Sequence, residues 1–203
     1  MTPTRIWGRV LLAAGALILS LALDPWVWRN LSLAGVYERD WGRMLRVVGS
    51  LVFWIPLALA VWLAMRRAHD PRSGRAALLF WGPALAGGVA ELIKLAVRRE
   101  RPGFADGAYV FRDFAERTWS TSGLGFPTSH GMVAFGGAAV LARLFPGTAP
   151  VAYALAAGCA VTRILAGAHF ASDAVGGAIF GWAIGALLWR RFGGVTTPDR
   201  VTT

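Results

Sequence analysis

Charged residues and cysteine are scarce in this sequence. Only 16% of the 203 residues are charged, and eleven of them are acidic. Cysteine occurs once, as Cys159 inside an apolar run, so an intrachain disulfide is excluded and the redox compartment stays open. Blocks of Lys and Arg interleaved with polar surface are also missing. We therefore expect no nucleic-acid partner, despite a net charge of +10.

Hydrophobic residues, in contrast, make up 56% of the chain, and the mean hydropathy is +0.51. This composition is typical of an integral membrane protein, and the length favours one domain. We place a membrane domain at 1–192 and a polar C-terminal tail at 193–203. The positive charge then suggests anionic membrane lipids and an anionic substrate as partners.

The apolar runs predict an all-α bundle of six membrane-spanning helices, judged against the ~20 residues that a bilayer requires. The predicted spans are 6–23, 47–65, 76–97, 129–145, 151–168 and 172–191. We expect the first run to be retained rather than cleaved as a signal peptide. The segment 24–46 mixes charges with aromatic residues, which indicates an amphipathic segment on the membrane surface. Gly177, Gly181 and Gly185 predict close helix packing in the last span.

The distribution of Arg predicts the orientation in the membrane. Cations predominate at both ends of the chain and in the segment 66–75, which favours cytoplasmic termini. The polar stretch 98–126 and the turn 163–173 then face outward together.

That turn carries the most unusual group of residues in the chain, Arg163, His169 and Asp173. Ionisable groups at membrane depth are costly, which makes them candidates for function. On a helix, His169 and Asp173 would share one face, and the carboxylate could fix the imidazole tautomer. Gly167 would let the chain turn, so that Arg163 comes back over the same spot.

Two further clusters fall on the same predicted side. Lys94 and Arg101 are seven residues apart, which predicts that they share one helical face. Thr128, Ser129 and His130 begin the fourth span, where backbone N–H groups at a helix start form an anion site.

Three cations, hydroxyl groups and two histidines favour a phosphate site. A metal site built from His130, His169 and Asp173 is the alternative. The three cations would repel a divalent ion, so we expect neither a metal nor a cofactor.

The ordered motifs Lys94-x6-Arg101-Pro102, Pro127-Thr128-Ser129-His130 and Arg163-x5-His169-x3-Asp173 resemble those of the type 2 phosphatidic acid phosphatase (PAP2) superfamily. Two departures stand out. Thr128 and Ser129 occupy positions where the family usually has Ser and Gly, and Thr162 replaces the Ser before the motif arginine.

The resemblance implies a two-step phosphoryl transfer. His169 would be the nucleophile, Asp173 would orient it, and His130 would protonate the leaving oxygen. Lys94, Arg101 and Arg163 would hold the phosphate oxygens, assisted by Thr128 and the amides near Ser129.

The implied function is a lipid phosphatase at the outer face of a bacterial-type inner membrane. Undecaprenyl diphosphate is the first expected substrate, while phosphatidic acid, phosphatidylglycerol phosphate and lipid A phosphate stay open. Two alternatives remain: a phosphotransferase on the same scaffold, and a transporter or structural bundle without chemistry.

Several other charged residues near these motifs have less specific expectations. We expect Glu91 to pair with Lys94, with a role in substrate choice as the minority interpretation. Arg98 and Arg99 are candidates for contacts with lipid headgroups or with a second phosphate. Arg112 and Arg117 lie among acidic residues, which predicts a solvated loop face.

Overall fold

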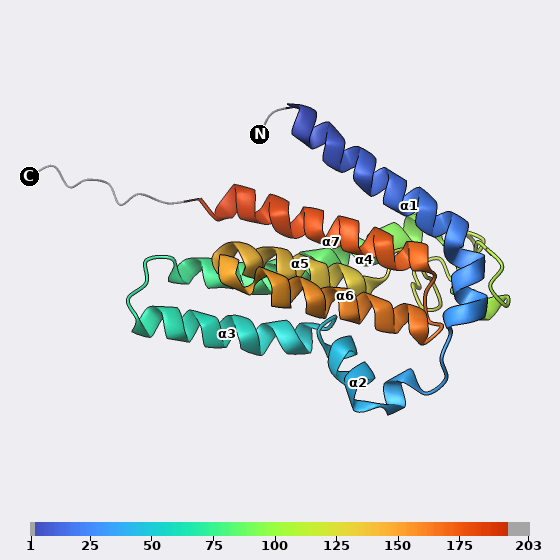
Figure 1. Cartoon of the computed structure of the whole chain (residues 1–203), viewed down its shortest axis with the longest axis horizontal. Helices are drawn as coiled ribbons and strands as arrows, with labels where there is room; N and C mark the ends of the chain where they lie inside the picture. The colour runs from blue at the N-terminus through green and yellow to red at the C-terminus, as the bar shows by residue number, and fades with distance from the viewer. Residues whose placement is uncertain (1–2, 195–203) are drawn as a thin grey trace, which may run out of the picture.

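The apolar runs fold into long helices that lie roughly side by side along one axis (Figure 1). This computed structural model describes residues 3–194, so most of the predicted tail 193–203 lies outside the described residues. The helices are α1 (Pro3–Leu31), α2 (Asp40–Val47), α3 (Leu51–Arg67), α4 (Leu78–Val97), α5 (Ser129–Leu144), α6 (Ala149–Leu165) and α7 (Ala171–Phe192). Short 3₁₀ turns are η1 (Val36–Glu38), η2 (Ser73–Ala77), η3 (Pro102–Phe104) and η4 (Pro146–Thr148).

Four helical stretches within the described residues are long and apolar enough to cross a membrane, which confirms an all-α membrane bundle. The bent pair α2 and α3, with a 64° angle between them, makes a fifth if it counts as one span. Helix α5 has 16 residues. At about 1.5 Å per residue it is shorter than a bilayer core of roughly 30 Å. Six crossings therefore remain a prediction.

Helix α1 is longer than predicted, because it continues through Asp24 and Pro25 to Leu31. A proline inside a helix leaves the carbonyl four residues earlier without its partner. That carbonyl belongs to Leu21, and the hydroxyl of Tyr109 lies 3.3 Å from its oxygen. The loop between α4 and α5 therefore reaches α1 beside Pro25, a contact that local sequence could not reveal.

The predicted surface segment 24–46 is consequently split. Its first part belongs to α1, and its last part forms α2, an eight-residue helix that follows η1. The side chains of Arg43 and Arg46 are exposed on α2, while Gly42 is buried against Val36. A position at the membrane surface stays a prediction for this helix.

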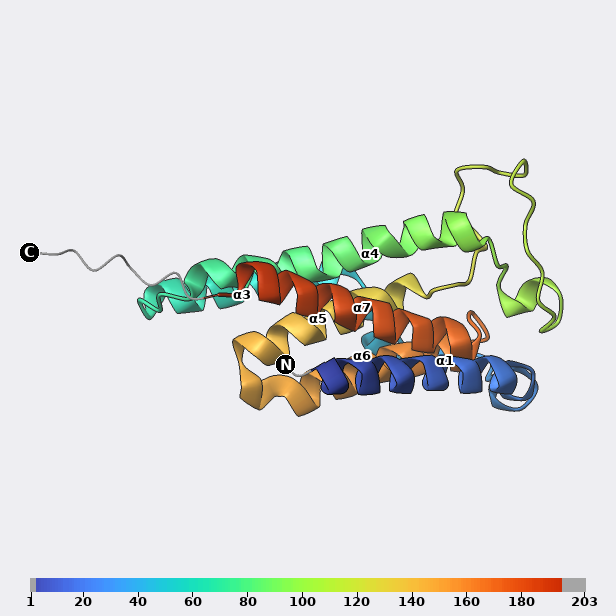
Figure 2. The ribbon, with the colours of Figure 1, turned by 90° about the horizontal axis from the view of Figure 1, so that it is seen from above.

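Helix α5 lies at the centre of the bundle, between α4, α6 and α7 (Figures 1 and 2). The predicted glycine ridge of α7 is confirmed, because it allows this close approach. A Cβ on Gly181 would lie 2.4 Å from the carbonyl oxygen of Met132, and one on Gly185 would lie 2.4 Å from that of Gly136. The chemistry-bearing first turn of α5 is therefore held firmly against α7.

The polar segments gather at one end of the bundle. Both views place the loop between α4 and α5 beside the turn between α6 and α7 and the later part of α1 (Figures 1 and 2). The three sequence motifs meet at this end, where α4 finishes and where α5 and α7 begin.

Candidate active site

The first and second motifs meet through Lys94 and Ser129. Lys94, in the last turn of α4, donates hydrogen bonds to the hydroxyl of Ser129 and, at 3.0 Å, to Glu91 Oε1. The Ser129 hydroxyl also donates to Glu91 Oε1 at 2.5 Å. The predicted pairing of Glu91 with Lys94 is confirmed. The lysine side chain is 6% exposed, so its ammonium is held at a largely desolvated position.

The prediction that Lys94 and Arg101 share a helical face is wrong. Helix α4 ends at Val97, and Arg98 takes a left-handed conformation with φ 58°, which turns the chain away from the helix axis. Arg101 therefore lies outside the helix, yet it is near enough to His169 for its charge to lower the pKa of that imidazole. The loop after α4, and not helical periodicity, thus brings Arg101 to the site.

The second motif joins the third at the start of α5. Thr128 is the residue that precedes the helix, and its backbone N–H donates to the carbonyl of Asp173 at 3.1 Å. Its hydroxyl makes no capping hydrogen bond, although the residue is fully buried. The first-turn amides of α5 have no helical acceptor, as in every helix, so this helix start presents donors to an anion.

The third motif has the predicted pairing of imidazole and carboxylate. Nδ1 of His169 lies 3.3 Å from Oδ2 of Asp173, which also accepts the backbone N–H of Phe170 at 2.9 Å. Gly167 has φ 63°, a left-handed conformation that allows the expected turn. Because Nδ1 faces the carboxylate, Nε2 is the nitrogen left for a reaction partner.

Burial and positive charge keep His169 neutral. Its side chain is almost wholly buried, and desolvation is the main reason why the pKa falls to about 4. Asp173 opposes this shift by hydrogen bonding and charge, while Arg163 and Arg101 add to it. A neutral imidazole at pH 7 keeps a lone pair for attack.

Arg163 is positioned by a residue that the motifs do not contain. Its NH1 group donates to the hydroxyl of Tyr37 at 2.7 Å, and its guanidinium lies over the same ring at 5.5 Å. The guanidinium of Arg46 also lies over this ring, at 4.7 Å. Tyr37 belongs to η1, which sequence analysis treated only as interfacial.

Arg99 lies behind Asp173 rather than at a lipid headgroup, which corrects that expectation. It donates to Asp173 Oδ1 and, at 2.7 Å, to the hydroxyl of Ser172. Ser172 in turn donates to Asp24, whose other oxygen accepts the Ser172 backbone N–H at 2.9 Å. The hydroxyl of Tyr109 donates to Asp24 at 2.7 Å. This buried network links α1 to the carboxylate beside His169.

Arg98 and Arg112 hold the outer loop together, so two further expectations are wrong. Arg98 is 1% exposed and donates to four backbone carbonyls instead of meeting headgroups or a second phosphate. Arg112 is buried rather than solvated, and it forms an ion pair with Glu100 at 2.6 Å. Both guanidiniums are occupied by the loop that carries Arg101.

Buried donors without partners mark the spot where an anion would bind. Among the described residues, the atoms concerned are Nε of Arg99, Arg101 and Arg163 and the hydroxyl oxygen of Thr128. A buried polar group that lacks a hydrogen bond carries a desolvation cost of roughly 1–3 kcal/mol. Three of these four groups, those of Arg101, Arg163 and Thr128, belong to the three motifs.

Comparison with known protein families gives a result that agrees with this geometry. The model of the PAP2 superfamily matches residues 75–196, more than half of the chain. The chain belongs to the PAP2 superfamily. The matched region contains all three motifs, including the departures at Thr128, Ser129 and Thr162.

Two curated relatives of this PAP2 chain are described as lipid A 1-phosphatases, from Rhizobium johnstonii and Rhizobium etli. Each is 34% identical over 122 residues, which is 58% of this chain. The match spans only about half of each relative, 49% and 51%.

A solved structure shares the fold. It is the transmembrane PAP2-type phosphatidylglycerolphosphate phosphatase from Bacillus subtilis. The TM-score is 0.62 at 20% identity, over 94% of this chain and 98% of that one. At this level of identity the likeness establishes the arrangement of helices.

Two residues that differ from the usual PAP2 motifs, Ser129 and Thr162, have hydrogen-bond partners in this structure. The hydroxyl of Ser129 accepts from Lys94, a contact that a glycine could not make. Thr162 is buried, and its hydroxyl donates to the carbonyl of Cys159 at 2.7 Å, within the helix that carries Arg163. Thr162 therefore supports the helix rather than the anion.

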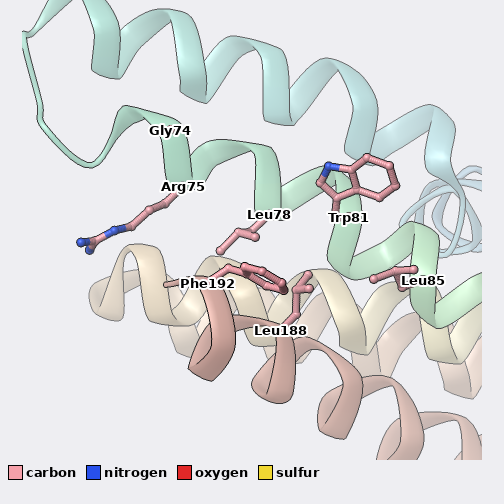
Figure 3. A pocket seen from close by; sticks show the side chains of 7 residues that line it. All are labelled: Gly74, Arg75, Leu78, Trp81, Leu85, Leu188 and Phe192. Atoms are coloured by element: carbon pink, nitrogen blue, oxygen red, sulfur yellow. The ribbon is translucent and has the colours of Figure 1, made fainter. Parts of the chain in front are cut away.

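A hollow of about 500 Å³ lies at the other end of this PAP2 bundle. Figure 3 shows it between the beginning of α4 and the end of α7, lined by Leu78, Trp81, Leu85, Leu188 and Phe192, with Arg75 at its edge. Lys94 and Asp173, which belong to the first and third motifs, lie near the opposite ends of these two helices. This apolar hollow is therefore separate from the chemistry.

Proposed function

We propose that this PAP2 protein is a membrane lipid phosphatase that hydrolyses a lipid phosphate or diphosphate through a phosphohistidine. The observation that supports this most is the set of buried, unpartnered donors on Arg101, Arg163 and Thr128, close to a neutral His169. Fixed donors aimed at the oxygens of a phosphoryl group stabilise its transition state without reorganisation.

In the first step, Nε2 of His169 attacks phosphorus and the bond to the leaving oxygen breaks. His130, half-buried at the start of α5, gives a proton to that oxygen. Arg101, Arg163 and Thr128 hold the non-bridging oxygens, together with the first-turn amides of α5. The imidazole gains positive charge as the nitrogen–phosphorus bond forms, and Asp173 stabilises it.

In the second step, His130 takes a proton from water, and the water oxygen attacks the phosphohistidine. The nitrogen–phosphorus bond breaks, His169 returns to the neutral state and inorganic phosphate leaves. Lys94 contributes charge when its ammonium turns from Glu91 and Ser129 toward the phosphate. These steps need no metal and no cofactor.

A lipid is the proposed substrate because the site lies at one end of a bundle with membrane-spanning helices. The relatives named lipid A 1-phosphatase and phosphatidylglycerolphosphate phosphatase are consistent with this class. We propose an inner-membrane location, cytoplasmic termini and a site that faces outward. Undecaprenyl diphosphate remains the first candidate, beside phosphatidate, phosphatidylglycerol phosphate and lipid A phosphate.

The test is phosphate release by the purified protein in lipid nanodiscs, without any acceptor lipid, from these four substrates. We expect release from at least one of them, and none by the His169→Ala variant. A labelled protein intermediate that is labile in acid and stable in base should appear in rapid-quench samples of the wild type. It should be missing from His169→Ala.

Other outcomes would replace the proposal. Label transfer to a lipid acceptor without release of phosphate would indicate a phosphotransferase. Failure of every substrate, in protein that is folded and correctly inserted, would favour a bundle without this chemistry.

A further inference from the structure

A cavity beside His130 has no role in the mechanism described above. It measures about 360 Å³, and its walls are formed by α2, by the start of α3 and by the start of α5. Its lining consists of Arg43, Arg46, Val47, Ser50, Val52 and His130. Two guanidiniums and an imidazole next to apolar side chains suit an anionic group attached to a lipid.

Arg46 is the stronger of the two cations, because it is free of carboxylates and close to the reaction centre. Among the described residues it forms no ion pair, and its guanidinium lies over the Tyr37 ring that also contacts Arg163. A single phenol ring therefore separates the cavity from the guanidinium that holds the reacting phosphate.

Arg43 is also available to an anion. Its ion pair with Asp40, at 2.6 Å, has side chains that are 61% and 98% exposed. Such exposed pairs contribute little to stability. An incoming anion can therefore take over this guanidinium at small cost.

The position of His130 decides which part of a substrate enters the cavity. Phosphoryl transfer requires the attacking and leaving atoms to lie roughly in line. His169 attacks from one side, so the leaving oxygen lies toward His130, its proposed proton donor. His130 is part of the cavity wall. The atoms that follow the leaving oxygen therefore pass Arg46 first.

The arginines predicted to bind a second phosphate cannot take this role. Arg98 is bound by backbone carbonyls, and Arg99 by Asp173 and Ser172. The α2 cavity is the cationic surface that remains next to the leaving group.

We infer that the cavity formed by α2 and His130 binds a second anionic group on the leaving-group side of the scissile bond. This inference rests on the proposed phosphatase function and deepens it. The substrate is then a lipid diphosphate, or a phosphate monoester joined by a short linker to a phosphodiester. With a diphosphate, the bond from the terminal phosphorus to the bridging oxygen breaks, and the lipid monophosphate leaves against Arg46 and Arg43.

The test compares two substrates with the same tail, farnesyl diphosphate and farnesyl monophosphate, in nanodiscs of neutral lipid. Arg46→Gln should lower the ratio of kcat/KM for the diphosphate to kcat/KM for the monophosphate about 10- to 100-fold. A loss of this size corresponds to one charge-assisted hydrogen bond. Arg43→Gln should lower the ratio less, since its guanidinium is shared with Asp40.

Arg39→Gln is the matched control, because Arg39 is exposed just before α2 and does not line the cavity. It removes the same charge and should leave the ratio unchanged. An equal loss for both substrates in Arg46→Gln would show that Arg46 acts through Tyr37 and Arg163 and not on a second anion. A loss that appears only with anionic lipid in the nanodisc would show that Arg46 meets bilayer headgroups. Either result would overturn the inference. Binding of free phosphate would be revealed by product inhibition that weakens in Arg46→Gln while the ratio stays constant, which also overturns it.

The two proposals fail in different ways. If the wild type hydrolyses both substrates and the ratio does not change, the cavity has no such role while the phosphatase proposal stands. If the wild type releases phosphate from neither of these substrates nor from the lipid panel above, the phosphatase proposal itself falls.

Discussion

The two sides of His169 differ in how completely their polar groups are satisfied. On one side, Asp173, Arg99, Ser172 and Asp24 form a network of buried hydrogen bonds, in which only Nε of Arg99 lacks a partner among the described residues. On the other side, Arg101, Arg163 and Thr128 each keep a buried polar atom without a partner among the described residues. The first arrangement fixes the position of Asp173, whereas the second leaves polar groups that hold the phosphate in the proposed mechanism. Substitutions on the first side should therefore mainly lower stability, whereas substitutions on the second side should mainly lower activity.

The largest effect should come from the residue between the two sides. His169→Ala removes the nucleophile, and we expect turnover to fall by at least roughly 10⁴-fold, as when other covalent nucleophiles are removed. Phosphate release measures this. Removal of this buried side chain should also lower the thermal midpoint, so turnover is compared in samples shown to be folded. Appreciable turnover in a folded variant would contradict the nucleophile assignment.

On the anion side, Arg163→Gln and Arg101→Gln should each reduce kcat/KM by about 10²–10³-fold, the usual cost of losing one transition-state donor. Removal of a partly unpartnered cation should leave stability nearly unchanged. Kinetics and thermal unfolding on the same samples test both statements. A large fall in stability with little kinetic loss would contradict the assignment of Arg163 and Arg101 to phosphate binding.

On the satisfied side, Arg99→Ala should act mainly on stability. It leaves the carboxylate of Asp173 buried without its cation, a change that costs about 3–5 kcal/mol. Denaturant unfolding in mild detergent measures the loss. Asp24→Asn should lower stability less than Arg99→Ala does, since an amide oxygen can still accept the Ser172 N–H. Unchanged unfolding of Arg99→Ala would mean that this network is not what holds Asp173.

The smallest effect concerns the pKa of His169, on which the two sides act with opposite sign. Arg101 lowers this pKa and Asp173 raises it. Arg101→Gln should therefore raise the value from about 4, and Asp173→Asn should lower it further. With only three histidines in the chain, NMR titration of labelled imidazoles can follow each ring. Shifts of the same sign in both variants would contradict this account.

The same pKa predicts how stability depends on pH. The pKa of His169 is lower in the folded protein than the usual 6.5, so the unfolded chain binds the proton more readily. The contribution of His169 to stability is complete above pH 6.5 and is lost as the pH falls toward 4.

Hydropathy was enough to predict the helical bundle, and motif order was enough to predict which residues gather at one end of it. Residues such as Lys94, Thr128 and His169 belong to motifs that can be recognised from the order of residues alone. The satisfied side could not be predicted in this way. Asp24 and Ser172 are 148 positions apart, and only the packing of α1 against α7 brings them together.

The errors about arginines have a common physical cause. Sequence patterns treat Arg98, Arg99 and Arg112 as surface charges, since isolated cations are rarely buried. Here Arg98 is surrounded by carbonyls of the loop between α4 and α5, and Arg112 pairs with Glu100 in the same loop. Arg99 pairs with Asp173 at the start of α7. Arg101 shows the related problem, because the left-handed residue Arg98 ends the helix before helical periodicity could apply.

The bond between Asp24 and α7 has a consequence for how the protein sits among lipids. Near its beginning, α1 leans away from α7 (Figure 1). An apolar groove of about 710 Å³ lies between Leu12 of α1 and Ile179 and Trp182 of α7. Toward its other end, α1 is held to α7 because Asp24 accepts a hydrogen bond from the Ser172 backbone N–H. Changes in bilayer thickness or in detergent should therefore alter the tilt of α1 about this fixed point, and catalysis should tolerate them as long as that fastening holds.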